Sequence, residues 1–128
     1  MLGESRNNQE KPASLPGIRI SSKWSLIYIF KSTIEALGRP HYVRFLIHPK
    51  KRLLSIVGSP KKERNSFPVP PRLFDNAGSE FKMGSKLLTQ QIYEIAGWES
   101  GCTHRVSGTY QPHLAAVVFE LREAERTS

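Results

Sequence analysis

Two apolar runs rich in β-branched residues, separated by four turn-forming residues, constrain the fold of this chain most strongly. The runs are HYVRFLIH (residues 41–48) and LLSIVG (residues 53–58), and the tetrapeptide PKKR (residues 49–52) lies between them. Apolar and polar side chains alternate along the first run, which is the period of a strand with one buried face. The arrangement predicts an antiparallel β-hairpin with residues 49–52 at its tip.

The elements before this hairpin predict a β-α-β-β unit. IRISSKWSLIYIF (residues 18–30) is typical of a strand that becomes buried on both faces towards its end. The segment KSTIEALG follows, in which Ser32 and Glu35 have the spacing of a capping box and Gly38 can end a helix. We therefore expect a helix of two turns at most before the hairpin.

The second half of the chain predicts the same order of elements. EFKMG is a short strand, and SKLLTQQIYEIAG is a helix that Ser85 caps and Gly97 ends. THRVSGTY and LAAVVFEL then form a hairpin around residues 111–113.

Together these elements predict an α+β fold, in which two βαββ units share an antiparallel sheet with the helices on one side. We expect a disordered tail over residues 1–16 and a single domain over 17–128. That domain divides into a first unit (17–58), a proline-rich linker (59–79) and a second unit (80–122). The linker is either a strap across the core or a ligand for a partner protein.

The composition favours a cytoplasmic protein of one domain. A chain of 128 residues with a single Cys102 has the size of one domain and no pair of cysteines for an internal disulfide. It contains no apolar stretch long enough to span a membrane, and its first residues lack the apolar segment of a secretory signal.

The charge of the chain is unevenly distributed. The net charge is +8, and residues 17–64 carry eleven Lys and Arg against two Glu, whereas residues 65–128 carry six against seven acids. A one-sided positive field favours a polyanionic partner, with nucleic acid first and an anionic membrane surface second. We expect DNA, with RNA as the alternative, and no membrane partner. Lysines that only keep the protein soluble are the simpler explanation.

The candidate contact residues are the cations on the predicted sheet, on the hairpin tip and at the start of the linker. We expect them to bind phosphates without requiring a sequence code. They are Arg19, Lys23, Arg44, Lys50, Lys51, Arg52, Lys61, Lys62 and Arg64.

Residues 18–58 resemble the swapped-hairpin DNA-binding domain of the AbrB/SpoVT type, mainly through IEALG followed by VRF. The resemblance implies a transcriptional regulator, a basic hairpin that contacts DNA and a possible homodimer. The chain departs from the family's pattern where Phe30 replaces the proline before the helix and where RPHY replaces the glycine-aspartate step before the hairpin.

Motifs for catalysis or cofactor binding are missing from the sequence. It has no glycine-rich phosphate loop and no HExxH, and Cys102, His104 and His113 are too few for a structural zinc site. We expect Trp24 and Trp98 to fill the core. The prediction is a nucleic-acid-binding protein without enzymatic activity or cofactor. A protein-interaction module that uses the sheet edge or the linker is the alternative, and a small enzyme comes third.

Overall fold

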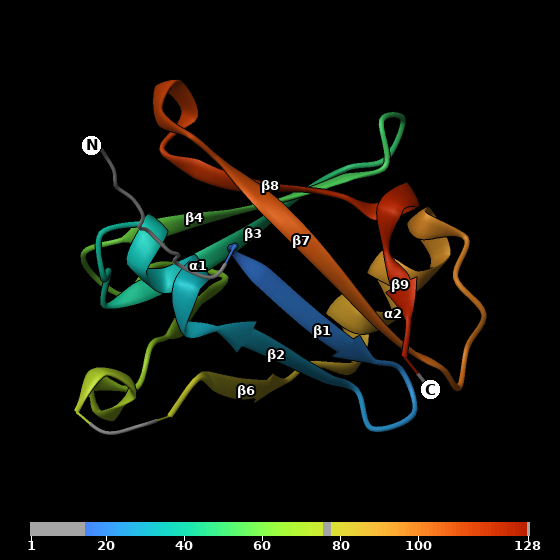
Figure 1. Ribbon diagram of the computed structural model, residues 1–128, viewed down its shortest axis with the longest axis horizontal. Coiled ribbons are helices and arrows are strands. Elements are labelled where there is room, and N and C mark those ends of the chain that lie inside the picture. Colours follow the sequence, from blue (N-terminus) through green and yellow to red (C-terminus); the bar gives the residue numbers. More distant parts are fainter. Residues whose placement is uncertain (1–14, 76–77, 128) are drawn as a thin grey trace, which may run out of the picture.

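The computed structural model describes residues 15–75 and 78–127 of the chain. Within them, two α-helices and three short 3-10 helices accompany nine strands (Figure 1). The elements in chain order are β1 (Gly17–Ser21), β2 (Leu26–Phe30), α1 (Lys31–Ala36), β3 (Tyr42–His48), β4 (Leu53–Ser59), β5 (Ser66–Pro68), η2 (Pro71–Phe74), β6 (Glu80–Gly84), α2 (Lys86–Ala96), β7 (Thr103–Gln111), η3 (Pro112–Leu114), β8 (Ala116–Glu120), η4 (Leu121–Glu123) and β9 (Glu125–Arg126).

All nine strands belong to one antiparallel sheet that curls into a half-barrel. The strand order is β5-β3-β4-β8-β7-β1-β2-β6, and β9 pairs with β7 outside this path. The long strand β7 crosses the middle of the molecule and pairs with β1 through its first half and with β8 through its second (Figure 1). Strand β7 therefore joins the two halves of the sheet.

The core lies on the concave face of this sheet. Ile18, Ile20, Ile27 and Ile29 are completely buried, and they alternate with outward-facing residues along β1 and β2. Helix α2 lies behind β1 and β7 in Figure 1 and adds Ile92 to the same core. The face of β1, β2, β6 and β7 that points away from this core is called the outer face below.

The prediction for the second helix is confirmed. The Ser85 side chain accepts a hydrogen bond from the Leu88 amide at the start of α2, and Gly97 ends the helix with a left-handed φ of 73°. Leu88 and Ile95 are partly buried on the same stripe as the buried Ile92.

The capping box predicted for the first helix is wrong. Helix α1 begins at Lys31, so Ser32 lies in its first turn, and the N-cap residue Phe30 has no side-chain hydrogen bond. The Ser32 hydroxyl instead donates to the Leu15 carbonyl at 2.8 Å, and the Glu35 carboxylate pairs with Arg39.

Both predicted hairpins are present. Strands β3 and β4 pair from Tyr42 with Ser59 to His48 with Leu53, which leaves residues 49–52 as the tip. Strands β7 and β8 pair around the short helix η3.

The predicted α+β fold of two βαββ units with helices on one side is wrong, because the chain is mainly β and forms one curled sheet. The sequence predicts a single strand over residues 18–30, but residues 22–25 make a turn in which Ser25 has a φ of 55° and its amide donates to the Ser22 carbonyl. The extra strand β1 then enters the sheet between β2 and β7.

Part of the proline-rich segment 59–79 packs against the body of the protein. It contributes β5, which pairs with β3, and its Val69 and Leu73 are buried in the core. These contacts agree with the strap expected from the sequence. Most of the predicted tail, residues 1–14, lies outside the described residues.

Among the described residues, no helix combines the length and the apolar character needed to cross a lipid bilayer.

Candidate functional site

The nine cations predicted as contacts do not form one surface. Residues 50–52 are at the tip of the β3–β4 hairpin, whereas Lys61, Lys62 and Arg64 follow the far end of β4. Lys23 lies in the turn between β1 and β2, where its ammonium is 5.3 Å from the ring centre of Trp24.

Two of these cations are already paired with carboxylates. Arg44 on β3 lies 3.8 Å from the Glu63 carboxylate. Arg19 on β1 donates two hydrogen bonds to Glu80 on β6, at 3.0 and 3.2 Å. Such pairs reduce the charge that a polyanion meets.

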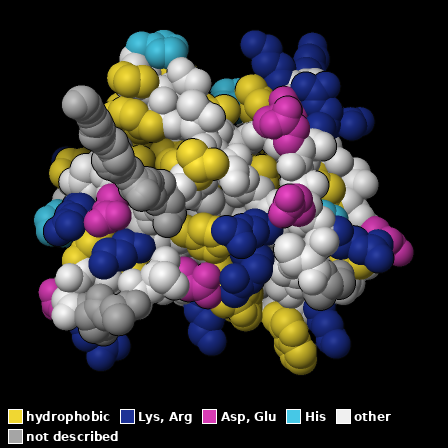
Figure 2. Space-filling model, viewed as in Figure 1, with side chains coloured by type: hydrophobic (Ala, Val, Ile, Leu, Met, Phe, Trp, Pro, Cys, Tyr) yellow, Lys and Arg dark blue, Asp and Glu magenta, His cyan; other side chains and the backbone are white. Residues whose placement is uncertain are grey.

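The hairpin tip is exposed, but it has acidic neighbours. The Arg52 carbonyl accepts a hydrogen bond from the Leu121 amide, which brings the tip beside η4. Hydrogen bonds from Arg122 lower the pKa of the Glu120 carboxyl to about 2, and the charge of Arg52 adds to this effect. Basic side chains project at this corner of the molecule, upper right in Figure 2, next to acidic ones.

A row of cations and aromatic rings crosses the outer face. The pairing of the strands places Arg105, Arg19, Tyr28 and Lys82 directly next to one another on β7, β1, β2 and β6. The guanidinium carbon of Arg19 lies 4.1 Å from the centre of the Tyr28 ring. This face is turned towards the viewer in Figure 2, where basic side chains lie near its centre.

The two arginines face each other across paired strands, an arrangement that costs stability because their charges repel. Only Arg19 has a carboxylate partner, Glu80. Glu125 lies opposite Arg105 on β9, but within the described part of the chain Arg105 forms no ion pair. Its guanidinium carbon instead lies 5.0 Å from the centre of the Phe30 ring.

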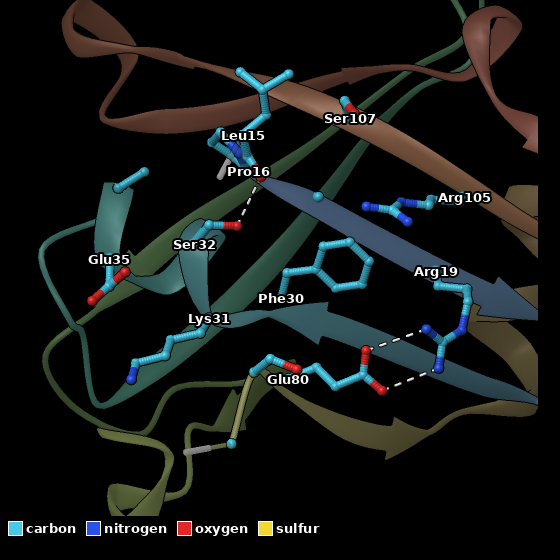
Figure 3. A pocket seen from close by; sticks show the side chains of 14 residues that line it. Leu15, Pro16, Arg19, Phe30, Lys31, Ser32, Glu35, Glu80, Arg105 and Ser107 are labelled. Carbon is cyan, nitrogen blue, oxygen red and sulfur yellow. Dashed lines mark hydrogen bonds and ion pairs between the residues drawn. The ribbon is translucent and has the colours of Figure 1, made fainter. Parts of the chain in front are cut away.

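A cleft of about 1000 Å³ opens beside this row (Figure 3). Its floor includes the Phe30 ring, with Arg105 next to it and the Arg19–Glu80 pair at one side. Leu15 and Pro16 line the opposite side, with the hydroxyl of Ser32 below them.

The cleft has an excess of positive charge that the protein does not neutralise. Three cations and two carboxylates line it. Glu80 pairs with Arg19, and Glu35 pairs with Arg39, which is outside the lining. Among the described residues, Lys31 and Arg105 therefore line the cleft without an ion pair.

Arg105 and Lys82 were missed because charge was summed along the sequence, where their half of the chain has no positive excess. The sequence does contain a signal for them. Polar and apolar residues alternate along THRVSGTY and EFKMG, so Arg105 and Lys82 point to the face opposite the apolar side chains of their strands. The prediction that Trp24 fills the core is wrong, since 67% of its surface is exposed, whereas Trp98 packs on the core as predicted.

The residues considered for a metal site lie apart. His104 is buried in the first half of β7, while His113 follows the other end of that strand. The His104 ring stacks on Trp98 at 4.4 Å, and its Nδ1 is 3.3 Å from the Tyr93 hydroxyl. Burial lowers the pKa of His104 and raises that of Tyr93. The described residues contain no group of three or more His, Cys, Asp or Glu that could hold a metal ion.

Comparison of the chain with protein-family models, with curated proteins and with solved structures found no match in any of the three. The AbrB-like assignment is not supported, because the protein is a mainly β half-barrel and residues 18–30 form two strands.

Proposed function

We propose that this protein binds nucleic acid through the outer face of β1, β2, β6 and β7. The observation that carries the proposal is the row of Arg105, Arg19, Tyr28 and Lys82, which the strand register places side by side. Cations interleaved with aromatic rings on the open face of a sheet can bind phosphates and stack on bases.

The unpaired charge of Arg105 supports a ligand that is an anion. A guanidinium has five donors, and Arg105 donates none of them to another described residue. Its repulsion with Arg19 offers no gain in folding, whereas phosphate oxygens would accept hydrogen bonds from it and offset the repulsion. Lys82 and Lys31 extend the positive surface on either side.

The hairpin tip is the rival surface for the same ligand. It offers three adjacent cations, Lys50, Lys51 and Arg52, which makes it an attractive phosphate contact. The nearby Glu120 is already paired with Arg122, but the turn at the tip contains no aromatic side chain on which a base could stack. We therefore favour the outer face and treat the tip as the matched control.

Two double variants test the proposal. Lys82→Ser with Arg105→Ser removes two cations from the outer face, and Lys50→Ser with Lys51→Ser removes two from the tip. Both variants have the same net charge, so a difference in binding between them shows which of the two surfaces contacts the nucleic acid. Binding of a labelled oligonucleotide is measured by fluorescence anisotropy at about 50 mM and about 200 mM salt, since the slope of log K against log salt counts phosphate contacts.

We expect the outer-face variant to lose affinity and to reduce that slope by about 1.5, and the tip variant to change both much less. Melting curves for both variants check that the fold is kept, because exposed charges contribute little to stability. A larger loss in the tip variant would contradict the assignment to the outer face. No salt-dependent binding by the unchanged protein would contradict nucleic-acid binding altogether and favour the protein-interaction alternative.

A further inference from the structure

We infer that the ligand of the outer-face cleft is single-stranded nucleic acid, with one unstacked base held against Phe30 and Arg105 and the neighbouring phosphates on Arg105 and Lys31. This inference rests on the proposed function and assigns the class of nucleic acid to the same surface.

The Phe30 ring is held in a fixed place on the outer face. It lies against the backbone of Gly17 on the neighbouring strand, where a Cβ atom would come within 2.7 Å of the ring. Gly17 is itself held by Thr33, whose hydroxyl accepts from the Gly17 amide and donates to its carbonyl, both at 2.8 Å. The ring thus forms a preformed flat floor, which lowers the entropy cost of stacking a base on it.

Arg105 provides a second planar group beside this floor. Its guanidinium carbon lies 5.0 Å from the Phe30 ring centre, and Figure 3 shows the group next to the ring at the cleft. Bases stack on guanidinium planes as well as on aromatic rings, while the free N–H groups of the same arginine can bind a phosphate. Arg105 can therefore contact both parts of one nucleotide.

Lys31 lies on the opposite side of the Phe30 ring from Arg105 in the view of Figure 3. Both cations line the cleft, and neither has an ion pair among the described residues. A strand that passes over the ring would therefore meet a positive charge before and after the stacked base. The Ser107 hydroxyl, at the rim beside Arg105, adds a polar group for the sugar or phosphate.

The concave shape favours a single strand over a duplex. The bases of a duplex are stacked inside it, so they can reach the floor of the cleft only after they unpair. A single strand has unstacked bases available, and a volume of about 1000 Å³ has room for one nucleotide. An intact duplex would contact only the cations at the rim.

The first arm of the test uses the unchanged protein, so it does not depend on how a variant folds. Anisotropy titrations compare a single strand of about 12 nucleotides with its duplex and with the same strand carrying abasic sites. DNA and RNA strands of equal sequence are run in parallel. We expect the single strand to bind about tenfold more tightly than either the duplex or the abasic strand, because a stacked base contributes about that factor.

The second arm compares Phe30→Leu with Tyr110→Leu. Leucine at position 30 keeps an apolar cover on Gly17 but removes the flat ring, and Tyr110 is an exposed aromatic residue near the far end of β7. We expect Phe30→Leu to lose about tenfold in affinity for the single strand and almost nothing for the duplex. Tyr110→Leu should bind both like the unchanged protein.

The possible outcomes separate the two proposals. If the duplex or the abasic strand binds as tightly as the intact single strand, the inference is wrong while nucleic-acid binding stands. If Phe30→Leu weakens single-strand and duplex binding equally, the ring has only a structural role and the inference is again overturned. If the unchanged protein binds none of the probes, the proposed function itself is wrong.

Discussion

Replacing Tyr93 with phenylalanine should destabilise the protein by about 2 kcal/mol, because one buried hydroxyl links three parts of the chain. It accepts a hydrogen bond from the Ser22 amide at 3.3 Å and lies within hydrogen-bond reach of the carbonyls of Ile20 and Cys102. It also lies 3.3 Å from His104 Nδ1. The hydroxyl thereby fastens helix α2 to β1, to the β1–β2 turn and to the approach to β7.

The size of this loss in stability follows from the backbone groups that Tyr93→Phe leaves without a hydrogen-bond partner. The single proton of the hydroxyl satisfies one carbonyl at a time, so the substitution removes one donated bond and the bond accepted from Ser22. Each contributes about 1 kcal/mol in a buried site, and Tyr93 is only 5% exposed. The ring keeps its edge-to-face contact with Trp98, at 5.1 Å between centres, so packing changes little.

Urea unfolding followed by tryptophan fluorescence measures this loss, and the slope of the transition should stay unchanged. For a domain of this size, the same loss lowers the melting temperature by about 8 °C. Tyr110→Phe is the control, because Tyr110 is 39% exposed and its hydroxyl has no hydrogen bond to the other described residues. A loss below about 0.5 kcal/mol for Tyr93→Phe would show that the hydroxyl does not hold these segments together.

Two further changes test the interior and the helix starts. The pKa of His104 is lowered by burial and by the charge of Arg126, against an opposing effect of Glu99, so the unfolded chain binds more protons. The free energy of unfolding should therefore fall as the pH drops below about 6.5. His104→Gln should remove this part of the pH dependence. Urea melts run from about pH 8 to about pH 5 measure both effects. Ser85→Ala should cost about 1 kcal/mol because it removes a true N-cap, whereas Ser32→Ala should cost less than about 0.5 kcal/mol in the same assay, since Ser32 bonds only the exposed Leu15 carbonyl. Equal losses at the two serines would contradict the difference in their roles.

Local features of the fold were predictable from the sequence because each depends on a few adjacent residues. The hairpin at residues 49–52 follows from alternating strands around a short turn, and helix α2 follows from Ser85, Gly97 and an apolar stripe. The turn at residues 22–25 was missed because it contains no Gly, Pro, Asn or Asp. Serine at position 25 adopts the left-handed conformation there, with a φ of 55°, which its residue type does not indicate.

The order of the strands could not be predicted, because it depends on contacts between distant segments. β1 pairs with β7, which lies 82 to 90 residues further along the chain, through Gly17 with Ser107 to Ser21 with Thr103. No local pattern distinguishes this partner from the other apolar strands of the chain. The Phe30 floor of the cleft depends on the same kind of information, since it requires Gly17 on the adjacent strand.

The predicted binding residues illustrate the difference between charge along a chain and charge on a surface. Residues 17–64 hold most of the positive charge, yet Arg19, Arg39 and Arg44 each have a carboxylate partner in the folded protein. The outer face gains Lys82 and Arg105 from the half of the chain that has no positive excess. A polyanion responds to the field of one face over a distance of about 10 Å, so the pairing of β7, β1, β2 and β6 decides which cations it meets. For this reason the comparison of the outer-face double variant with the tip double variant tests the location of binding more directly than a variant that only lowers the net charge.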